Sequence, residues 1–222
     1  MLRAEHISFS YRNKQVLRDV CLTAKEGDFI GIIGKNGCGK STLLSVLAGV
    51  KRPDSGTLSY QDAPLYKKGS VPAKLVGYVP QLNPLLPELS VQDNLKLWFR
   101  EATALPKDAL QELYDQMGLT ECFSTAVKKL SEGMKKRVSI ASVLQNAPSI
   151  LILDEPSAAL DLPCKEVIHA QLLSFVKKGG IIFFTTHEEA EFSLCTTLYI
   201  LKDGVLQQAD VHSDKSTLIQ QF

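Results

Sequence analysis

The sequence contains no long run of apolar residues and almost no excess of charge of either sign. No segment approaches the roughly 18 apolar residues that a membrane-spanning helix needs, and residues 1–15 lack the apolar core of a signal peptide. Lysine and arginine number 25 against 24 acidic residues, which leaves a net charge of +1. This balance argues against broad electrostatic binding of nucleic acid or of an anionic membrane. If the protein works at a membrane, we expect a separate chain to supply the membrane part.

Cysteine is scarce as well. The five cysteines are odd in number, and no two of them have Cys-x-x-Cys spacing. Both facts argue against a disulfide framework or a zinc site and indicate reduced thiols in a reducing compartment. Hydrophobic residues make up 45% and charged residues 22%, so the chain is neither polar nor charged enough to be disordered. A chain of 222 residues allows one large domain, or one core domain with an inserted subdomain.

The pattern of apolar residues predicts strands that alternate with helices. Strands are expected at residues 2–11, 16–24, 29–33, 56–60, 74–79, 150–153 and 181–185, with a hairpin at 198–206. Helices are expected at residues 40–48, 166–177 and 188–194. Strands that alternate with helices predict an α/β fold with a mostly parallel sheet covered on both faces. We expect an antiparallel β subdomain at the N-terminus of this core.

The middle of the chain has a different pattern. Apolar residues fall near helical spacing from residue 91 to about residue 145, and they include Leu95, Trp98 and Met117. We expect Trp98 and its neighbours to pack this segment. The interpretation is therefore a single domain, with residues 1–80 and 146–222 as the core and residues 81–145 as a mainly helical insertion.

The strongest motif is a glycine-rich stretch directly after a predicted strand. Residues 34–41 read GKNGCGKS, which matches the G-x-x-x-x-G-K-[ST] phosphate-binding pattern, and a predicted helix follows at once. Glycines let the backbone wrap around phosphates, and amides at a helix N-terminus attract anions. The residues expected to hold the nucleotide are Asn36, Gly37, Cys38, Gly39, Lys40, Ser41 and Thr42. Lys40 would reach the β- and γ-phosphates, Ser41 would ligate Mg²⁺, and Thr42 would add a hydroxyl. The alternative is a plain glycine turn before a helix.

Polar side chains follow three other predicted strands. Asp154 and Glu155 come directly after an apolar strand, and ligands bind at that end of parallel sheets. Asp154 would hold Mg²⁺ through water, and Glu155 would orient and polarise the attacking water. His187 follows another strand and would hydrogen-bond a γ-phosphate, while Gln81 gives a weaker signal. Taken alone, such residues are more often solvated or structural groups, and the phosphate loop upstream favours the catalytic interpretation.

The order of these motifs resembles the ABC ATPase family over essentially the whole chain. Between Gln81 and the acidic pair lies the sequence LSEGM at residues 130–134, and Asp161 and His187 follow the acidic pair. The resemblance implies a P-loop NTPase core in which two subunits sandwich two ATP molecules. Residues 130–134 would then cap the nucleotide bound to the opposite subunit, and residues 157–161 would cross the dimer interface.

The resemblance also implies roles for single residues. Tyr11 would stack on adenine, and Gln81 would touch Mg²⁺ and report to the membrane partner. Ser131 and the backbone of Gly133 would contact the γ-phosphate across the dimer. Glu155 would be the catalytic carboxylate and His187 the switch histidine.

The family signature is Leu-Ser-Gly-Gly-Gln, and this chain departs from it at Glu132 and Met134. A carboxylate at residue 132 adds negative charge near phosphate if it points inward, whereas the other interpretation is that it points to solvent. A basic run follows at residues 135–137, and its role stays open between a solvated helix face and a contact with phosphate. Cys38 lies at the start of a helix, where thiols become more reactive, so we expect labelling that ATP blocks.

The function implied is the ATP-hydrolysing subunit of an ABC transporter. Its partners would be ATP with Mg²⁺, a second nucleotide-binding subunit and an integral membrane permease, with no role for nucleic acid. The protein would lie in the cytoplasm, on the inner face of the membrane. Met134 and the residues around it look more like export-type cassettes. A soluble ABC-type ATPase of cofactor assembly and a non-catalytic nucleotide sensor are the alternatives, and a homodimer and a heterodimer are both open.

Overall fold

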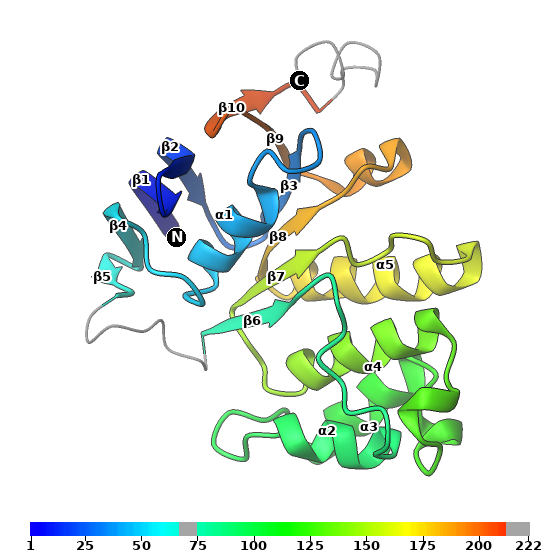
Figure 1. Cartoon of the computed structure of the whole chain (residues 1–222). Coiled ribbons are helices and arrows are strands. Elements are labelled where there is room, and N and C mark those ends of the chain that lie inside the picture. Colours follow the sequence, from blue (N-terminus) through cyan, green and yellow to red (C-terminus); the bar gives the residue numbers. More distant parts are fainter. Residues whose placement is uncertain (67–74, 212–222) are drawn as a thin grey trace.

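The computed structural model describes residues 1–66 and 75–211, and it contains two sheets (Figure 1). The first sheet has the order β2-β1-β4-β5 and is antiparallel throughout. Its strands are β1 (Leu2–Tyr11), β2 (Lys14–Ala24), β4 (Ser55–Tyr60) and β5 (Ala63–Pro64). This sheet confirms the expected antiparallel subdomain at the N-terminus. The short strand β5 was not anticipated.

The second sheet forms the centre of the molecule and has the order β10-β9-β3-β8-β7-β6. Its strands are β3 (Phe29–Ile33), β6 (Val76–Val79), β7 (Ile150–Asp154), β8 (Ile181–Thr185), β9 (Thr197–Lys202) and β10 (Val205–Ala209). The first five of these strands run parallel to their neighbours, and only β10 pairs antiparallel, in a hairpin with β9. Every residue of β3, β7 and β8 is buried, as expected for apolar strands covered on both faces.

Helices cover the two faces of this sheet, and each face has its own apolar core (Figure 1). The helices are α1 (Lys40–Leu47), α2 (Val91–Trp98), α3 (Lys107–Gln116), α4 (Glu132–Leu144) and α5 (Leu162–Lys177). Short 3₁₀ helices lie at Thr120–Cys122, Val127–Lys129 and Glu189–Leu194. The core beneath α1 also takes in the N-terminal antiparallel sheet, while the opposite core joins α4 and α5 to the central sheet.

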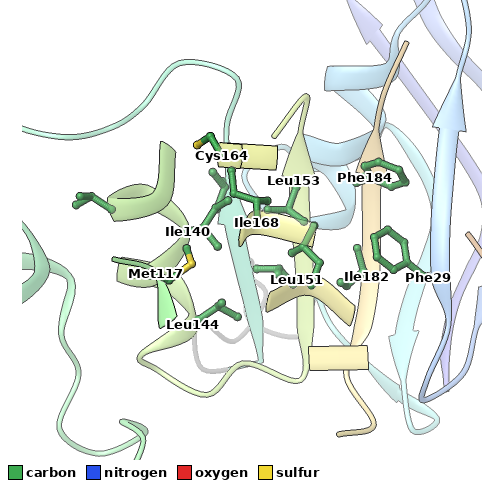
Figure 2. Packing of buried hydrophobic residues seen from close by; sticks show 14 of the residues in the cluster. Phe29, Met117, Ile140, Leu144, Leu151, Leu153, Cys164, Ile168, Ile182 and Phe184 are labelled. Carbon is green, nitrogen blue, oxygen red and sulfur yellow. The ribbon is translucent and has the colours of Figure 1, made fainter. Parts of the chain in front are cut away.

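The helical segment shares its core with the central sheet. Met117, Ile140 and Leu144 from this segment lie in one buried cluster with Leu151 of β7 and Ile168 of α5 (Figure 2). Each buried aliphatic side chain of this size contributes roughly 1.5–3 kcal/mol to stability. Because one core spans both parts, the side chains of α4 are held firmly against the edge of the sheet.

Some elements differ from the sequence expectation for local physical reasons. Helix α5 begins at Leu162 because the side chain of Asp161 accepts a hydrogen bond from the backbone of Cys164 at 3.0 Å, which caps the helix. The segment at Glu189–Leu194 is a 3₁₀ helix. The strand expected at residues 74–79 begins at Val76, and residue 74 lies outside the described residues.

The packing expected for Trp98 is wrong in part. Trp98 is 40% exposed, and its neighbours Leu97 and Phe99 are 55% and 39% exposed, whereas Leu95 is buried. Helix α2 therefore buries Val91, Asn94 and Leu95, and the apolar residues at and just beyond its C-terminal end are exposed. Among residues 1–66 and 75–211, no helix has both the length and the apolar character needed to cross a membrane.

Candidate active site

Four parallel strands deliver the expected site residues to one edge of the central sheet. Strand β3 leads into the phosphate loop, β8 into His187, β7 into Glu155 and β6 into Gln81. The strand order β3-β8-β7-β6 places these four sequence segments in a row. Because neighbouring strands lie about 4.8 Å apart, the loop and Glu155 are separated by two strand spacings, about 10 Å.

The phosphate loop connects β3 directly to α1. Gly37 and Gly39 have φ values of 77° and 114°, in the left-handed region that favours glycine. A Cβ on Gly39 would lie 2.8 Å from a side-chain carbon of Val16, so the N-terminal sheet also requires glycine there. Lys40 is buried, and its Nζ donates to the carbonyl oxygens of Gly34 at 2.8 Å and Lys35 at 3.1 Å. The backbone of the loop thus binds this ammonium group through two carbonyl oxygens, at the N-terminus of a helix.

Thr185 at the end of β8 anchors the acidic pair. Its hydroxyl donates to Oδ1 of Asp154 at 2.7 Å and accepts from the backbone N–H of Glu155 at 3.0 Å. Asp154 is buried, and Glu155 has a φ of 48°, an uncommon value for a residue with a side chain. Sequence reasoning missed Thr185, although a hydroxyl at the end of an otherwise apolar strand was a visible signal.

The side chains of Gln81 and His187 both contact the carboxylate of Glu155. Nε2 of Gln81 donates to its Oε2 at 3.0 Å, and Nε2 of His187 lies 3.2 Å from its Oε1. The Glu155 side chain is 18% exposed and the His187 side chain 42% exposed, so solvent reaches both. Three residues that follow three different strands therefore meet, although the contacts of Gln81 and His187 with Glu155 were not themselves predicted from the sequence.

Tyr11 lies beside the phosphate loop. Its hydroxyl is 3.4 Å from Oγ1 of Thr42, and this hydrogen bond is the main cause that lowers the pKa of Tyr11. Nζ of Lys51 lies 5.0 Å from the centre of the ring and was not anticipated as a neighbour. The tyrosine is 45% exposed, so solvent reaches part of this side chain beside the loop.

The segment at residues 130–134 opens helix α4. Ser131 is the N-cap and accepts a hydrogen bond from the backbone of Met134 at 3.2 Å. A Cβ on Gly133 would lie 2.6 Å from Sγ of Cys164, so α4 approaches α5 closely there. The side chain of Glu132 is 73% exposed in the single chain and pairs with Lys135 at 2.7 Å.

Within the described residues, Ser131 does not join the phosphate loop of its own chain. Ser131 and Gly133 line a hollow of about 420 Å³ together with residues 159–161, 163 and 164, and no residue between 34 and 42 is among those that line it. Ser131 thus lies beside the segment expected to cross a dimer interface. This separation agrees with a contact made to a second subunit.

The basic run at residues 135–137 is not a solvated helix face. Lys135 pairs with Glu132, and Nε of Arg137 donates to Sγ of Cys164 at 3.3 Å. Lys136 is buried, and its Nζ donates to the carbonyl oxygens of Pro80 at 3.3 Å and Gln81 at 3.0 Å. Each of the three cations therefore has a different partner inside the same chain.

A buried carboxylate behind the site also escaped sequence reasoning. Glu191 is 1% exposed and accepts hydrogen bonds from the hydroxyls of Ser157 and Thr186, while Nε2 of His169 lies 2.7 Å from its Oε1. Ser157 follows Glu155 by two residues, and Thr186 precedes His187. Glu191 therefore holds Ser157, which lies just after Glu155, and Thr186, which lies just before His187.

The residues proposed to hold Mg²⁺ offer suitable donors. Ser41 contributes a hydroxyl, Asp154 a carboxylate and Gln81 an amide oxygen, since its Nε2 is engaged with Glu155. Oxygen ligands of this kind are what Mg²⁺ prefers in proteins. The donor set therefore fits this ion.

Comparison with known proteins gives one consistent family. The model of a family described as "ABC transporter" matches residues 17–158. A Nod factor export ATP-binding protein from Paraburkholderia xenovorans is 34% identical over 205 residues, covering 90% of this chain and 67% of that protein. A spermidine/putrescine import ATP-binding protein from Spiroplasma citri is 33% identical over 227 residues, covering 98% and 65%. The chain thus spans about two thirds of the length of these relatives.

A solved structure has the same fold. The dimeric ATP-binding cassette MJ0796, in a post-hydrolysis state bound to ADP and Pi, superposes with a TM-score of 0.83 at 24% identity and covers 96% of this chain and 100% of that one. The likeness extends over both sheets and the helical segment. It confirms the expected α/β core with an antiparallel sheet and a helical insert.

Proposed function

The chain belongs to the ABC transporter family, as an ATP-binding cassette that hydrolyses ATP, and from that premise we propose that it drives transport by closing against a second cassette on a separate membrane permease. The observation that carries this proposal is the convergence of Gln81 and His187 on the Glu155 carboxylate, at the sheet edge that holds the phosphate loop. The residues proposed for catalysis and for reporting to a partner then touch one another, at the edge of the sheet where the phosphate loop would bind the nucleotide.

In the proposed reaction Glu155 acts as the general base. Its carboxylate orients the attacking water and takes a proton from it as the water oxygen bonds to the γ-phosphorus and the bond to the β-phosphate oxygen breaks. Lys40 and the loop amides stabilise the negative charge on the phosphoryl oxygens, and His187 holds Glu155 in place. Mg²⁺, held by Ser41, Asp154 and Gln81, would neutralise phosphate charge.

The second subunit completes the proposed site. Ser131 and Gly133 would contact the γ-phosphate bound to the partner, and Tyr11 would stack on the adenine of its own nucleotide. The exposure of Ser131 at the N-terminus of α4 and the separation of Ser131 from its own phosphate loop support this arrangement.

An exposed apolar surface next to Gln81 supports a permease partner. A hollow of about 380 Å³ lies between the core and the helical segment and is lined by Val50, Tyr78, Pro80 and Trp98 among others. Leu82, one residue beyond Gln81, is 84% exposed. Apolar groups gathered in this way mark sites of protein interaction. A permease segment seated here would touch the strand end that carries Gln81.

We propose export as the direction of transport. Met134 at the fifth position of the signature resembles export-type cassettes, and a Nod factor export protein is among the relatives. A spermidine/putrescine import protein is among them too. In vesicles that display the cassette on their outer face, export predicts ATP-driven accumulation of substrate inside, whereas import predicts release.

The test of the transport assignment is the identity of the partner. Wild-type protein is expected to co-purify with an integral membrane protein that raises its ATPase rate after reconstitution in vesicles. Leu82→Asp should abolish this association and leave the ATPase rate of the isolated chain unchanged. Association with a soluble assembly complex in place of a membrane protein would support the cofactor-assembly alternative.

A further inference from the structure

Lys136 lies where the helical segment meets the segment that carries Gln81. It belongs to the second turn of α4, and its Nζ donates to the carbonyl oxygens of Pro80 at 3.3 Å and Gln81 at 3.0 Å. The chain that leaves β6 passes beside α4 before it reaches α2 (Figure 1). Lys136 thus binds the backbone of this passing segment directly after the strand ends.

The ammonium group is held in an environment that is costly for a cation. Lys136 is only 6% exposed, and its Nζ donates hydrogen bonds to two neutral carbonyl oxygens. Burial lowers the pKa of Lys136, and the negative charges of Asp154, Glu132 and Glu155 raise it in part. An apolar side chain of the same length would pack this position without the loss of hydration. Stability alone therefore does not account for a lysine at this position.

A continuous chain of contacts leads from this lysine to the catalytic carboxylate. Lys136 binds the backbone of Gln81, and the side chain of Gln81 donates to Oε2 of Glu155 at 3.0 Å. Ser131, the residue proposed to contact nucleotide on the other subunit, caps the N-terminus of α4. A displacement of α4 would therefore move the Gln81 backbone and change its contact with Glu155.

We propose that Lys136 is a positioning residue that holds the backbone of Gln81 against α4. The side chain of Gln81 then contacts Glu155 only while α4 keeps its position beside the end of β6. The inference rests on the proposed function of Gln81 and Glu155 and adds a link between the partner-facing helix and the base. Lys136 touches neither nucleotide nor water in this role and acts through Gln81 alone.

A double-mutant cycle on kcat tests the link. Lys136→Met keeps the length of the side chain and removes its donors, and it is expected to lower kcat for ATP roughly tenfold with little change in KM. In a Gln81→Ala background, where the link is already broken, the same substitution should change kcat by less than about twofold. Lys177→Met removes an exposed lysine from the end of α5 and serves as the matched control with wild-type kcat.

Two further measurements separate positioning from a loss of folding. The melting temperature of each variant is recorded, and Lys136→Arg, which keeps the charge and the N–H donors, is expected to retain at least half of the wild-type kcat. If Lys136→Met does not fold, Lys136→Gln takes its place in the cycle.

The outcomes distinguish this inference from the proposed function. An equal loss of kcat in both backgrounds, or no loss in the wild-type background, would overturn the role of Lys136 while leaving Gln81 and Glu155 as proposed. A Gln81→Ala variant with wild-type kcat would instead contradict the proposed role of Gln81, and the inference would fall with it.

Discussion

The Nε2 atom of His187 lies 3.2 Å from Oε1 of Glu155, so a residue just beyond the end of β8 contacts the carboxylate that directly follows β7. Strands β7 and β8 are parallel neighbours, and the hydroxyl of Thr185 on β8 also donates a hydrogen bond to Asp154 on β7. The proposed base is thus fixed on its backbone side by β8 and on its carboxylate side by His187. A base held in this way needs little reorganisation when the water attacks the γ-phosphorus.

Loss of His187 should slow hydrolysis without removing ATP binding. In His187→Ala the Glu155 carboxylate loses the imidazole that lies 3.2 Å from its Oε1, and kcat is expected to fall about 100-fold. ATP affinity, followed with a fluorescent ATP analogue, should change less than about threefold. His6→Ala, a substitution on the exposed side of β1, is the matched control. Wild-type turnover by His187→Ala would remove this residue from the proposed mechanism.

Lys40 should control affinity for the nucleotide itself. Its ammonium is buried within the phosphate loop, so Lys40→Ala removes the one charge that the loop encloses, and ATP affinity is expected to fall at least about tenfold. Lys35→Ala, in the same loop but exposed, should cause a much smaller loss. Equilibrium titration of both variants with ATP measures the difference, and equal losses would contradict the placement of Lys40.

Cys38 should report occupancy of the loop. The thiol is half-buried within the phosphate loop, whereas Cys21 is exposed on β2 and serves as an internal control. Bound ATP is expected to slow labelling of Cys38 by a maleimide and to leave labelling of Cys21 unchanged. Mass spectrometry of peptides after short exposures gives both rates in one sample. If ATP leaves the Cys38 rate unaltered, the nucleotide does not cover this loop.

Glu191 should make stability depend on acid pH. Burial raises its pKa, but hydrogen bonds from His169, Ser157 and Thr186 outweigh burial, so the pKa is lowered in the folded protein. A group with a lowered pKa stabilises the fold above its unfolded pKa of about 4.3, and this contribution is lost as the pH falls. The free energy of unfolding, measured with urea, should therefore fall more steeply between about pH 7 and about pH 3.5 for wild type than for Glu191→Gln.

The matched control for this measurement is Glu189→Gln. Glu189 is an exposed carboxylate in the same 3₁₀ helix. Its removal should therefore leave the fall of the free energy of unfolding at acid pH the same as in the wild type. Identical pH profiles for wild type and Glu191→Gln would show that the hydrogen bonds of Glu191 do not favour its charged form.

The parts of the site that follow strand ends could be predicted from the sequence. The phosphate loop, Asp154 and Glu155, and His187 each come directly after an apolar run, and parallel strands bring such positions to one edge. The signal is local, because a few consecutive residues specify both the strand and the polar group that follows it. For the same reason the strands were placed with small errors at their ends.

Contacts between distant segments could not be predicted in this way. Lys136 reaches the carbonyl of Gln81 across 55 residues of sequence, and the run of three cations gives no sign of which one is buried. Glu191 likewise bonds Ser157 across 34 residues. The exposure of Trp98 depends on how α2 sits against the neighbouring elements, which helical spacing alone does not determine. Such features follow from tertiary packing, for which this sequence carries no local pattern.

The most direct test of the account is Mg²⁺-dependent ATP hydrolysis by the purified chain and by its Glu155→Gln variant, with ATP-dependent dimerisation followed by light scattering. The account predicts turnover in the wild type, and in the variant a loss of at least about 100-fold in kcat with retained ATP binding and a dimer that persists in ATP. A Glu155→Gln variant that hydrolyses ATP at the wild-type rate would contradict the assignment of Glu155 as the base.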